Sequence, residues 1–599
     1  MNRKKKEFIY PVIIILFIIL FGLVNYFWIN LDKSPPDHDE AFHLQESVRY
    51  YQQINKGEIS ESFFHYREYY PPLYYQITGV ISQFFGRSRR ISFLPNLIFL
   101  PILVFSMYFI GKKLWDEDVG LLSAIAVVSF PLIAYLSHKY YLDFATTSMV
   151  AISFFLLLKS DRFNNPGWTI LFFVSIAVGM LVKWSVPFYV ALPFAVCFFY
   201  FLADLIKDGK NRILNLAFLV LIPVFVLLGY YIIHGGVMGE QPFPLIKLAG
   251  IYIRSLIPLL FLLFITLLMP FRVKKVKYFI VGILVFFIII WHFYALNMPF
   301  VFEKLISGAS AGVQEGDTYS IPEFIYLFTT GFQGIPFSFL LVIGLIFYFA
   351  KNDKTPERNL LVAGLLSGIL ILYLLPNRDS RYLLPLAIYT APVCVFWITG
   401  IKLKWARYGI LTLFIIISFL GFAGWLVYNP GTQRIMKYRG YFPILALGPD
   451  REDWKLKYAV DRLVELSRGE KTAVLFMENI KRTNPININS ITWEFMRKTG
   501  DRLLILHGPW EKYPGAFYRN GEYYSFVFFS NMPKNRGGDF KRAFILMLRE
   551  KGDDSKIPRI FDTYIKKSGV TGDIKPIEKI NLPDDFLFWI LEIESIHIQ

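Results

Sequence analysis

The sequence predicts a polytopic α-helical membrane protein with about 13 transmembrane helices, external juxtamembrane helices and a C-terminal soluble α/β domain. Hydrophobic residues make up 55% of the 599 positions, and the mean hydropathy is +0.43. Apolar runs of spanning length recur as far as about residue 428, and the composition then becomes that of a soluble domain. These observations place the chain in the membrane class and predict a boundary between residues 1–428 and 429–599.

The N-terminus reads MNRKKK and is followed by an apolar run from Phe8 to about Trp28. This run is long enough to span a bilayer, and no small-residue cleavage site closes it. We therefore expect a retained first helix with a cytoplasmic N-terminus, since basic residues favour the cytoplasmic side.

Later runs of spanning length predict the remaining membrane helices. They lie at about 90–112, 119–137, 143–159, 167–182, 185–206, 212–234, 251–269, 276–297, 323–350, 358–375, 381–400 and 406–428.

The run from Pro71 to Phe85 is ambiguous, because it is short, partly polar and begins with Pro-Pro. Placing it outside the bilayer puts nearly all the short basic loops on the cytoplasmic side, as the positive-inside rule requires. We therefore expect an external, interfacial or re-entrant segment. Two features disagree with this topology, namely the external basic sequence GRSRR at 86–90 and the charge-balanced cytoplasmic loop at 111–120.

The C-terminal part alternates strand-like and helical patterns, which predicts a compact α/β domain. Strands are expected at 472–477, 503–507, 523–529 and 586–593, and helices at 451–468, 489–499, 538–551 and 558–568. No GxGxxG or P-loop motif marks a nucleotide site. Acceptor recognition or shielding of a site in the membrane part are the roles we consider for this domain.

Charge and cysteine content exclude several classes of protein. The net charge of +17 is concentrated in short loops between apolar runs, so membrane orientation explains it better than nucleic-acid binding. Cys197 and Cys394 are far apart in apolar runs and indicate no disulfide framework or thiolate metal site. Ionisable residues are rare within the predicted spans, which argues against an ion-coupled transporter.

The loop at 31–89 combines acids, histidines and aromatic residues, and we interpret it as a catalytic loop. Asp37 precedes Glu40 by three residues, which is the spacing of a capping box at the start of a helix. Asp39 and Glu40 then lie in the first turn, where the helix dipole favours an ionised carboxylate, and His43 shares the face of Asp39. The alternative is that these acids only cap and solvate a surface helix.

A second external acid, Asp143, lies where a short loop enters a span, beside His138 and Lys139. A carboxylate at a membrane face needs a cation, a base or a hydroxyl as its partner. Asp143 is therefore a candidate site residue, the alternative being an N-cap of the next span.

Basic residues are scarce on the predicted external side. Lys183, Arg378 and Arg381 lie at outward ends of spans, and Arg67 and Lys139 lie in external loops. Such residues could bind a lipid-linked phosphate, with arginine offering bidentate contacts. Taken singly, each could equally be a snorkelling anchor of a helix end.

Aromatic residues crowd the same loop and could stack on a sugar or a prenyl chain, although interfacial belts have the same composition. They are Tyr50, Tyr51, Phe63, Phe64, Tyr66, Tyr69, Tyr70, Tyr74 and Tyr75.

An ordered set of motifs resembles the C-type membrane glycosyltransferases, and especially the protein O-mannosyltransferases and the aminoarabinose transferase of lipid A. The set comprises the Asp39-Glu40 pair, PPLYY at 71–75, Asp143, Lys183 and RYLLP at 381–385. The resemblance covers most of residues 1–428 and leaves the C-terminal domain unmatched.

The resemblance implies inverting transfer of a sugar, a mannose-like hexose or a modified pentose, from a polyprenyl phosphate to a hydroxyl of a protein, lipid or glycan acceptor. It makes Asp39 the catalytic carboxylate, Glu40 its support and Asp143 a second acidic site residue. Some relatives bind a divalent cation, which His43 and Asp39 could help to hold. Tyr70 stands where relatives often have lysine before Pro-Pro-Leu. The candidate substrate-binding residues are Arg67, Tyr70, His138, Lys139, Lys183, Arg378, Arg381 and Tyr382.

Two other functions fit parts of the sequence. Many spans and aromatic loops also suit a lipid-linked oligosaccharide flippase, which moves its substrate without breaking the sugar–phosphate bond. A glycan polymerase or ligase would use a similar lipid donor and differ in its acceptor.

Overall fold

The computed structural model describes most of the chain. The described residues are 3–58, 69–207, 212–237, 245–268, 274–314, 321–350, 355–374, 380–427, 448–468, 472–477, 486–499, 504–505, 517–519, 522–524, 542–550, 570–583 and 586–598.

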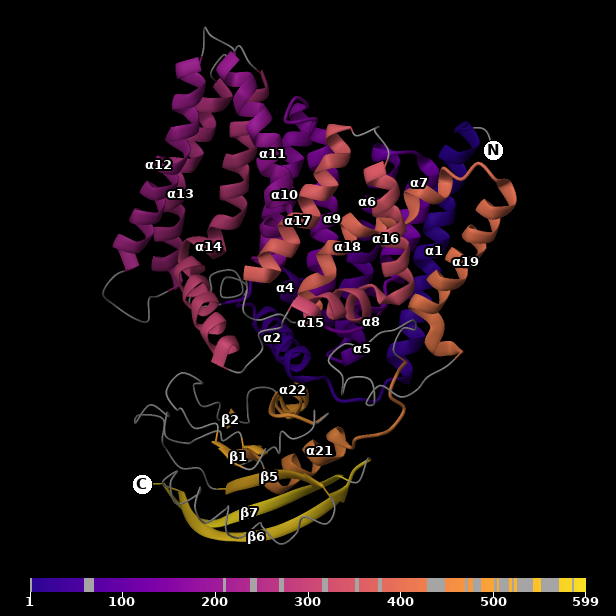
Figure 1. The fold of residues 1–599 in the computed structure, drawn as a ribbon. Helices are drawn as coiled ribbons and strands as arrows, with labels where there is room; N and C mark the ends of the chain where they lie inside the picture. The colour runs from indigo at the N-terminus through magenta and orange to yellow at the C-terminus, as the bar shows by residue number, and fades with distance from the viewer. Residues whose placement is uncertain are drawn as a thin grey trace.

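The part of the chain before residue 428 is helical (Figure 1). Its elements are α1 (Arg3–Leu31), α2 (His38–Asn55), α4 (Leu73–Phe85), α5 (Arg89–Ser92), α6 (Leu94–Leu114), α7 (Glu117–Ser129), α8 (Pro131–Ser137), α9 (Leu142–Ser160), α10 (Pro166–Val182), α11 (Val186–Lys207), α12 (Arg212–Val237), α13 (Leu245–Leu268), α14 (Lys274–Gln314), α15 (Ile321–Tyr326), η1 (Leu327–Phe332), α16 (Gly334–Ala350), α17 (Pro356–Leu374), η2 (Ser380–Leu386), α18 (Ala387–Thr399), α19 (Lys404–Ala423) and η3 (Gly424–Leu426).

The predicted class of multi-pass helical membrane protein is confirmed. Among the described residues, eight helices are long and apolar enough to cross a membrane, or nine if α7 and α8 form one bent span. Three shorter apolar helices lie at Pro166–Val182, Leu219–Ile233 and Gly334–Ala350. The expectation of about 13 spans stays a prediction.

The span at 119–137 is broken rather than continuous. Phe130 is extended, and Pro131 begins a new helix that is bent by 67° from the preceding one. Proline suits the first position of a helix because its missing N–H would have no partner there. The break sends α8 toward the end of the bundle near α2, where the chain continues to Lys139 and Asp143.

The uncertain segment at 71–85 forms α4, a 13-residue helix that packs on α2 and is not among the candidate spans. Tyr74 and Tyr75 are fully buried between the two helices and the bundle. The expected placement of α4 outside the bilayer stays a prediction.

The C-terminal unit contains a five-stranded mixed sheet with strand order β2-β1-β5-β7-β6 and a small separate hairpin, β3-β4. β1 is parallel to β2 and β5, whereas β7 is antiparallel to both β5 and β6. Its elements are α21 (Leu456–Ser467), β1 (Thr472–Met477), α22 (Ile488–Thr499), β2 (Leu504–Ile505), β3 (Phe517–Arg519), β4 (Glu522–Tyr524), β5 (Arg542–Glu550), β6 (Val570–Asn581) and β7 (Phe586–Ile598).

One predicted element of this unit is wrong. The apolar run expected as a helix at 538–551 is instead strand β5, placed between β1 and β7. A short continuous apolar run fits a fully buried strand as well as a buried helix, so tertiary pairing decided between them. β6 was missed, the expected helix at 558–568 lies outside the described residues, and the strands at 472–477 and 586–593 are confirmed.

The C-terminal unit lies at one end of the helical bundle, next to α2, and the N-terminus lies at the opposite end (Figure 1). α22 packs on α2, and its Trp493 is buried in the core of the helical part. The remaining sheet and α21 have a core of their own, built on residues such as Trp454, Phe544 and Phe588. The unit is therefore both self-packed and joined to the predicted catalytic loop.

Candidate active site

The first turn of α2 is fixed by Asp37, as the capping-box spacing predicts. Asp37 is the N-cap, and its Oδ1 accepts a hydrogen bond from the backbone N–H of Glu40 at 3.1 Å. Tyr141 donates to the same oxygen of Asp37. This cap sets the directions in which Asp39 and Glu40 leave the helix, because consecutive helical residues point about 100° apart.

Asp39 meets Arg381, which is more than 340 positions away in the sequence. Arg381 Nη2 donates to Asp39 Oδ2 at 2.7 Å, and His38 Nδ1 lies 3.3 Å from Asp39 Oδ1. Burial alone would raise the pKa of Asp39, but the hydrogen bond from His38 and the charge of Arg381 outweigh it and hold this pKa well below its usual range. Asp39 is therefore ionised throughout the physiological pH range.

Asp143 and Lys183 form a second, buried ion pair. Lys183 Nζ donates to Asp143 Oδ1 at 2.7 Å, and both side chains are less than a tenth exposed. Asp143 lies in the first turn of α9, and Lys183 is the C-cap of α10. The Lys183 ammonium also lies 5.1 Å from the centre of the Tyr382 ring. Two predicted site residues 40 positions apart thus meet where α9 begins and α10 ends.

His43 brings the two ion pairs into one site. It is buried, and the charges of Asp39, Lys183, Asp143 and Arg381 all act on its pKa. Burial lowers the pKa of His43 to about 4, so the ring is neutral at physiological pH. The sequence-predicted acids Asp39 and Asp143 therefore share one local electrostatic environment, together with their basic partners.

Aromatic rings line the space around His43. The centre of the Tyr70 ring lies 5.0 Å from that of His43, and the Tyr75 hydroxyl is 2.7 Å from His43 Nδ1. Tyr141 lies under the Arg381 guanidinium, 4.5 Å from ring centre to Cζ. Burial and the neighbouring Tyr382 raise the pKa of Tyr70, so its hydroxyl stays protonated and offers a neutral hydrogen-bond donor.

Protonation of His43 predicts a pH-dependent stability. The folded pKa is about 4 and the ordinary value is 6.5, so acidification favours the unfolded chain as pH falls below 6.5. Between pH 7 and pH 5 this group alone should remove about 2 kcal/mol of stability. We expect the melting temperature of wild type to fall more steeply over this interval than that of His43→Asn, in thermal unfolding followed in detergent. Parallel slopes for the two proteins would contradict the assignment.

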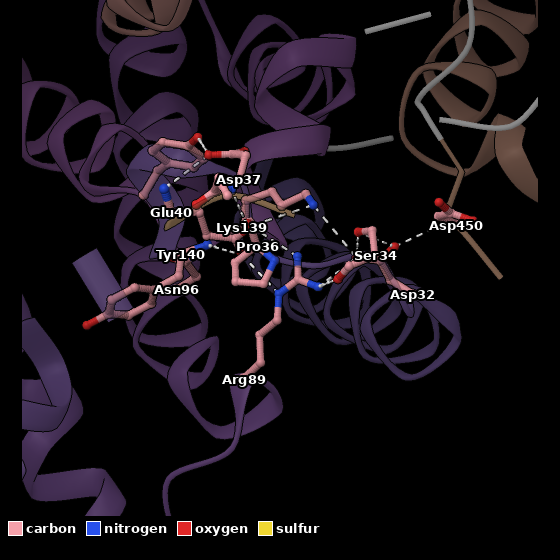
Figure 2. Close-up of polar contacts among 12 residues, drawn as sticks. Asp32, Ser34, Pro36, Asp37, Glu40, Arg89, Asn96, Lys139, Tyr140 and Asp450 are labelled. Carbon is pink, nitrogen blue, oxygen red and sulfur yellow. Dashed lines mark hydrogen bonds and ion pairs between the residues drawn. The ribbon is translucent and has the colours of Figure 1, made fainter. Parts of the chain in front are cut away.

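Glu40 points to a different cluster, the buried ion network of Figure 2. Arg89 donates to both Glu40 oxygens, Nε to Oε1 at 3.2 Å and Nη2 to Oε2 at 3.0 Å, and lies 3.0 Å from Asp32. Lys139 Nζ is 3.7 Å from both Asp32 and Glu40. Two anions thus balance two cations within the protein.

This placement changes the interpretation of Glu40 and Lys139. The sequence predicted that Glu40 supports Asp39 and that Lys139 binds a phosphate. In the structure each of them has two internal partners of opposite charge, Arg89 and Lys139 for Glu40 and Asp32 and Glu40 for Lys139, whereas Lys183 is paired with the single carboxylate of Asp143. His138 is buried and stacked on Trp28 at 3.7 Å, and burial lowers its pKa far below the usual value. We therefore propose that Glu40, Lys139 and His138 hold the loop in place rather than bind substrate.

The network also predicts where the protein is most sensitive to loss of one charge. Arg89→Ala would leave the buried carboxylates of Glu40 and Asp32 to share the single ammonium of Lys139, and removing one partner from a buried ion network typically costs about 3–5 kcal/mol. Arg90→Ala is the matched control, since Arg90 is exposed and its hydrogen bond to the Asn30 carbonyl is long, at 3.5 Å. A large drop in melting temperature for the first variant only is the expected result, and equal melting temperatures would refute it.

Sequence reasoning missed Arg89 and Tyr141. The only signal for Arg89 was that GRSRR is too basic for an external segment, and its ion pairs with Asp32 and Glu40 explain that anomaly. Tyr141 precedes Asp143 in a sequence where only the charged residues attracted notice. Arg67 and Arg378 lie outside the described residues.

The possible metal site at His43 and Asp39 stays a prediction. In the part of the chain that the structure describes, no group of three or more His, Cys, Asp or Glu side chains could hold a metal ion. Asp39, Glu40 and Asp143 each pair with a cationic side chain, and His43 Nδ1 is bonded to Tyr75.

The fold and the site define a class, that of multi-pass helical membrane proteins with paired acids and bases at one end of the bundle. The comparison with protein families is more specific. Residues 70–230 match the family described as dolichyl-phosphate-mannose-protein mannosyltransferase, which confirms the resemblance seen in the motifs and indicates a membrane glycosyltransferase. No curated protein matches the chain.

Solved structures give weaker likenesses. ArnT from Cupriavidus metallidurans in the apo state is 12% identical, with a TM-score of 0.37, covering 96% of this chain and 97% of that chain. ArnT bound to undecaprenyl phosphate is 12% identical, with a TM-score of 0.35, covering 97% and 98%. The oligosaccharyltransferase AglB from Archaeoglobus fulgidus, in complex with an inhibitory peptide and a dolichol-phosphate, is 9% identical, with a TM-score of 0.43, covering 83% and 64%. At TM-scores below 0.5, none of them establishes the position or role of a residue here.

Proposed function

We propose that the chain is an inverting glycosyltransferase that moves a sugar from a polyprenyl-phosphate donor to a hydroxyl acceptor at the outer membrane face. The sugar would be a mannose-like hexose or a modified pentose, and the acceptor a protein, lipid or glycan. Residues 1–428 would form the transferase, and residues 429–599 an extracytoplasmic domain.

The observation that carries this proposal is that Asp39–Arg381 and Asp143–Lys183 lie side by side, since Arg381 pairs with Asp39 and the ring of the next residue, Tyr382, lies 5.1 Å from the Lys183 ammonium. Acids suited to act on a hydroxyl and cations suited to a phosphate meet at one bundle end, beside aromatic rings that could contact a sugar. The family match at residues 70–230 includes both Asp143 and Lys183 and supports the same class of reaction.

Lys183 is the best candidate for the donor phosphate. An ammonium has three N–H donors, and Asp143 is the hydrogen-bond acceptor that the described residues provide for one of them. The remaining donors can bind phosphate oxygens while Asp143 keeps the ammonium in place. As the glycosidic bond breaks, negative charge grows on the leaving phosphate, and a preorganised cation stabilises that charge.

Asp39 is the candidate for the acceptor side of the reaction. Its low pKa makes it a weak base in the ground state, so its first task is to accept a hydrogen bond from the attacking hydroxyl and orient it. The hydroxyl proton becomes acidic only as the new bond to the anomeric carbon forms, and Asp39 accepts it at that stage. A single displacement by this route inverts the anomeric configuration, and phosphate leaves without a general acid.

The orientation in the membrane follows from the same proposal. The positive-inside distribution places the N-terminus in the cytoplasm, and the C-terminal unit lies at the opposite end of the bundle from the N-terminus (Figure 1). The site at α2 would therefore face the extracytoplasmic side, where the C-terminal unit also lies.

The test is incubation of membranes containing the full chain with a panel of radiolabelled polyprenyl-phosphate sugars, followed by separation of protein, lipid and glycan fractions. Transfer of label from one donor, with release of polyprenyl phosphate, is the expected result. Membranes lacking the chain are the control. Movement of an intact lipid-linked sugar across vesicle membranes without bond cleavage would instead establish a flippase and overturn the proposal.

A further inference from the structure

Within the described part of the chain, the C-terminal unit contacts the predicted catalytic loop at two places, at Asp450, whose backbone exchanges hydrogen bonds with Asp32 and Lys33, and at the start of α22, which lies beside His38. Asn489 Nδ2 lies 3.1 Å from both the backbone oxygen and the Nε2 of His38, and Asn487 Nδ2 donates to the Pro36 carbonyl at 3.2 Å. His38 immediately precedes Asp39. A helix that begins almost 450 residues later in the sequence thus holds the residue beside the candidate catalytic acid.

The orientation of the Asn489 amide is fixed by two carbonyl groups, which can only accept hydrogen bonds. The His38 carbonyl requires the Asn489 nitrogen on its side. The backbone carbonyl of Asn489 accepts a hydrogen bond from Gln45 Nε2 at 3.0 Å, which fixes the Gln45 nitrogen on this side. The same Gln45 nitrogen lies 3.4 Å from the side-chain oxygen of Asn489, Oδ1. The amide nitrogen of Asn489 therefore faces His38, and its oxygen faces Gln45.

This orientation selects one tautomer of His38. Because Asn489 donates to Nε2, that nitrogen carries the lone pair, and the proton of the neutral ring lies on Nδ1. Nδ1 is the atom that faces Asp39 Oδ1 at 3.3 Å. The ring consequently donates to the carboxylate, while Arg381 donates to the other oxygen, Oδ2, at 2.7 Å.

We propose that Asn489 is a positioning residue for Asp39, acting through His38, and that the C-terminal unit thereby completes the active site. Two donors from different elements hold both oxygens of Asp39 and fix the plane of the carboxylate. With the other tautomer, the bare lone pair of Nδ1 would face Oδ1, and the repulsion would turn the carboxylate away from its acceptor-binding direction. This inference rests on the proposed transfer reaction.

Substitutions of His38 test the tautomer directly. The side-chain nitrogen of asparagine is separated from the backbone by the same number of bonds as Nδ1 of histidine. The side-chain nitrogen of glutamine is separated by the same number of bonds as Nε2 of histidine. His38→Asn can keep the donor to Asp39, whereas His38→Gln cannot. We expect His38→Asn to retain kcat within about threefold of wild type and His38→Gln to lose about tenfold to a hundredfold, with donor KM unchanged in both.

Substitutions in α22 separate positioning from simple docking of the C-terminal unit. Asn489→Ala removes the donor to Nε2 and should lower kcat about as much as His38→Gln, with donor KM unchanged. Asn487→Ala is the matched control, since it removes another contact to the loop and also a hydrogen bond from the Ser490 N–H at 2.8 Å, but does not touch His38. It should keep kcat within about threefold of wild type.

The outcomes are distinguishable from failure of the proposed function. If wild type transfers no sugar, the proposed reaction is wrong. If wild type transfers sugar but His38→Asn and His38→Gln are equally active, or Asn487→Ala loses as much kcat as Asn489→Ala, the positioning role is wrong. Melting temperatures of all four variants, measured in the full chain, identify any loss that is due to unfolding.

Discussion

Asp39→Asn is expected to reduce sugar transfer by about 10²–10⁴-fold, the range associated with loss of a positioned general base. The amide keeps the size of the side chain but cannot accept the proton of the acceptor hydroxyl. Because Asp39 is half exposed, the loss of its pair with Arg381 should change stability little. Transfer is measured with the identified donor, and membrane insertion by the yield of folded protein in detergent.

A matched control for this variant is Asp118→Asn. Asp118 is also a partly exposed carboxylate with a cationic partner, Lys6 at 2.6 Å, but it lies in α7, which begins at Glu117, near the start of α1 rather than beside α2. It should leave transfer within about twofold of wild type. Full activity of Asp39→Asn would remove Asp39 from the mechanism and with it the central residue of the proposal.

The buried pair Asp143–Lys183 should show a different pattern, in which stability and activity separate. Lys183→Met leaves the Asp143 carboxylate buried without its ammonium, and breaking a buried pair in this way typically costs about 3–5 kcal/mol. The double variant Asp143→Asn with Lys183→Met removes both charges and should regain most of the lost melting temperature. Transfer should stay at least about a hundredfold below wild type in both, because the donor phosphate has lost its cation.

The double variant is the informative one. If it recovers transfer together with stability, the pair serves only the packing of α9 against α10 and does not contact substrate. Donor concentration dependence adds a second readout, since loss of a phosphate ligand should raise the donor KM as well as lower kcat. Asp39→Asn should by contrast change kcat alone, because Asp39 is assigned to the acceptor hydroxyl.

The sequence predicted Asp39, Asp143, Lys183 and Arg381 as candidates, and the structure brings all four together. Asp143, Lys183 and Arg381 lie at the ends of apolar runs, where a charge is costly unless a partner or a substrate stabilises it. Asp39 was indicated instead by the capping-box spacing at the start of the next helix. Such residues can be found one by one from local patterns in the sequence. Their pairing could not be predicted from the sequence, because Asp39 and Arg381 are separated by most of the helical part of the chain.

Glu40 and Lys139 show the limit of this reasoning. On residue type and position they resemble Asp39 and Lys183, and only the side-chain directions distinguish them. Glu40 turns toward Arg89. Arg89 belongs to the basic sequence GRSRR, which disagreed with the predicted external position of this segment. In a helix, the side chains of Asp39 and Glu40 point in directions about 100° apart. Which of these two directions faces the substrate depends on the helices packed around α2.

The C-terminal unit illustrates the same limit for secondary structure. Its alternation of elements predicted an α/β domain, yet the run at 542–550 became a strand because β1 and β7 pair with both of its edges. Its link to Asp39 through Asn489 has no signal in the sequence at all. Asparagine at a helix start is common as a cap, and nothing nearby in the chain indicates His38 as its partner.

The sequence by itself determined that this protein crosses the membrane repeatedly, that the composition changes after the last apolar run, and which charged residues lie at the ends of apolar runs. These properties follow from transfer of side chains between water and lipid, which depends on local composition. Only the tertiary structure decided which acid pairs with which base, and that α22 holds His38 beside Asp39. Pairing depends on distances of a few ångströms between distant segments, and the packing of the helices sets those distances.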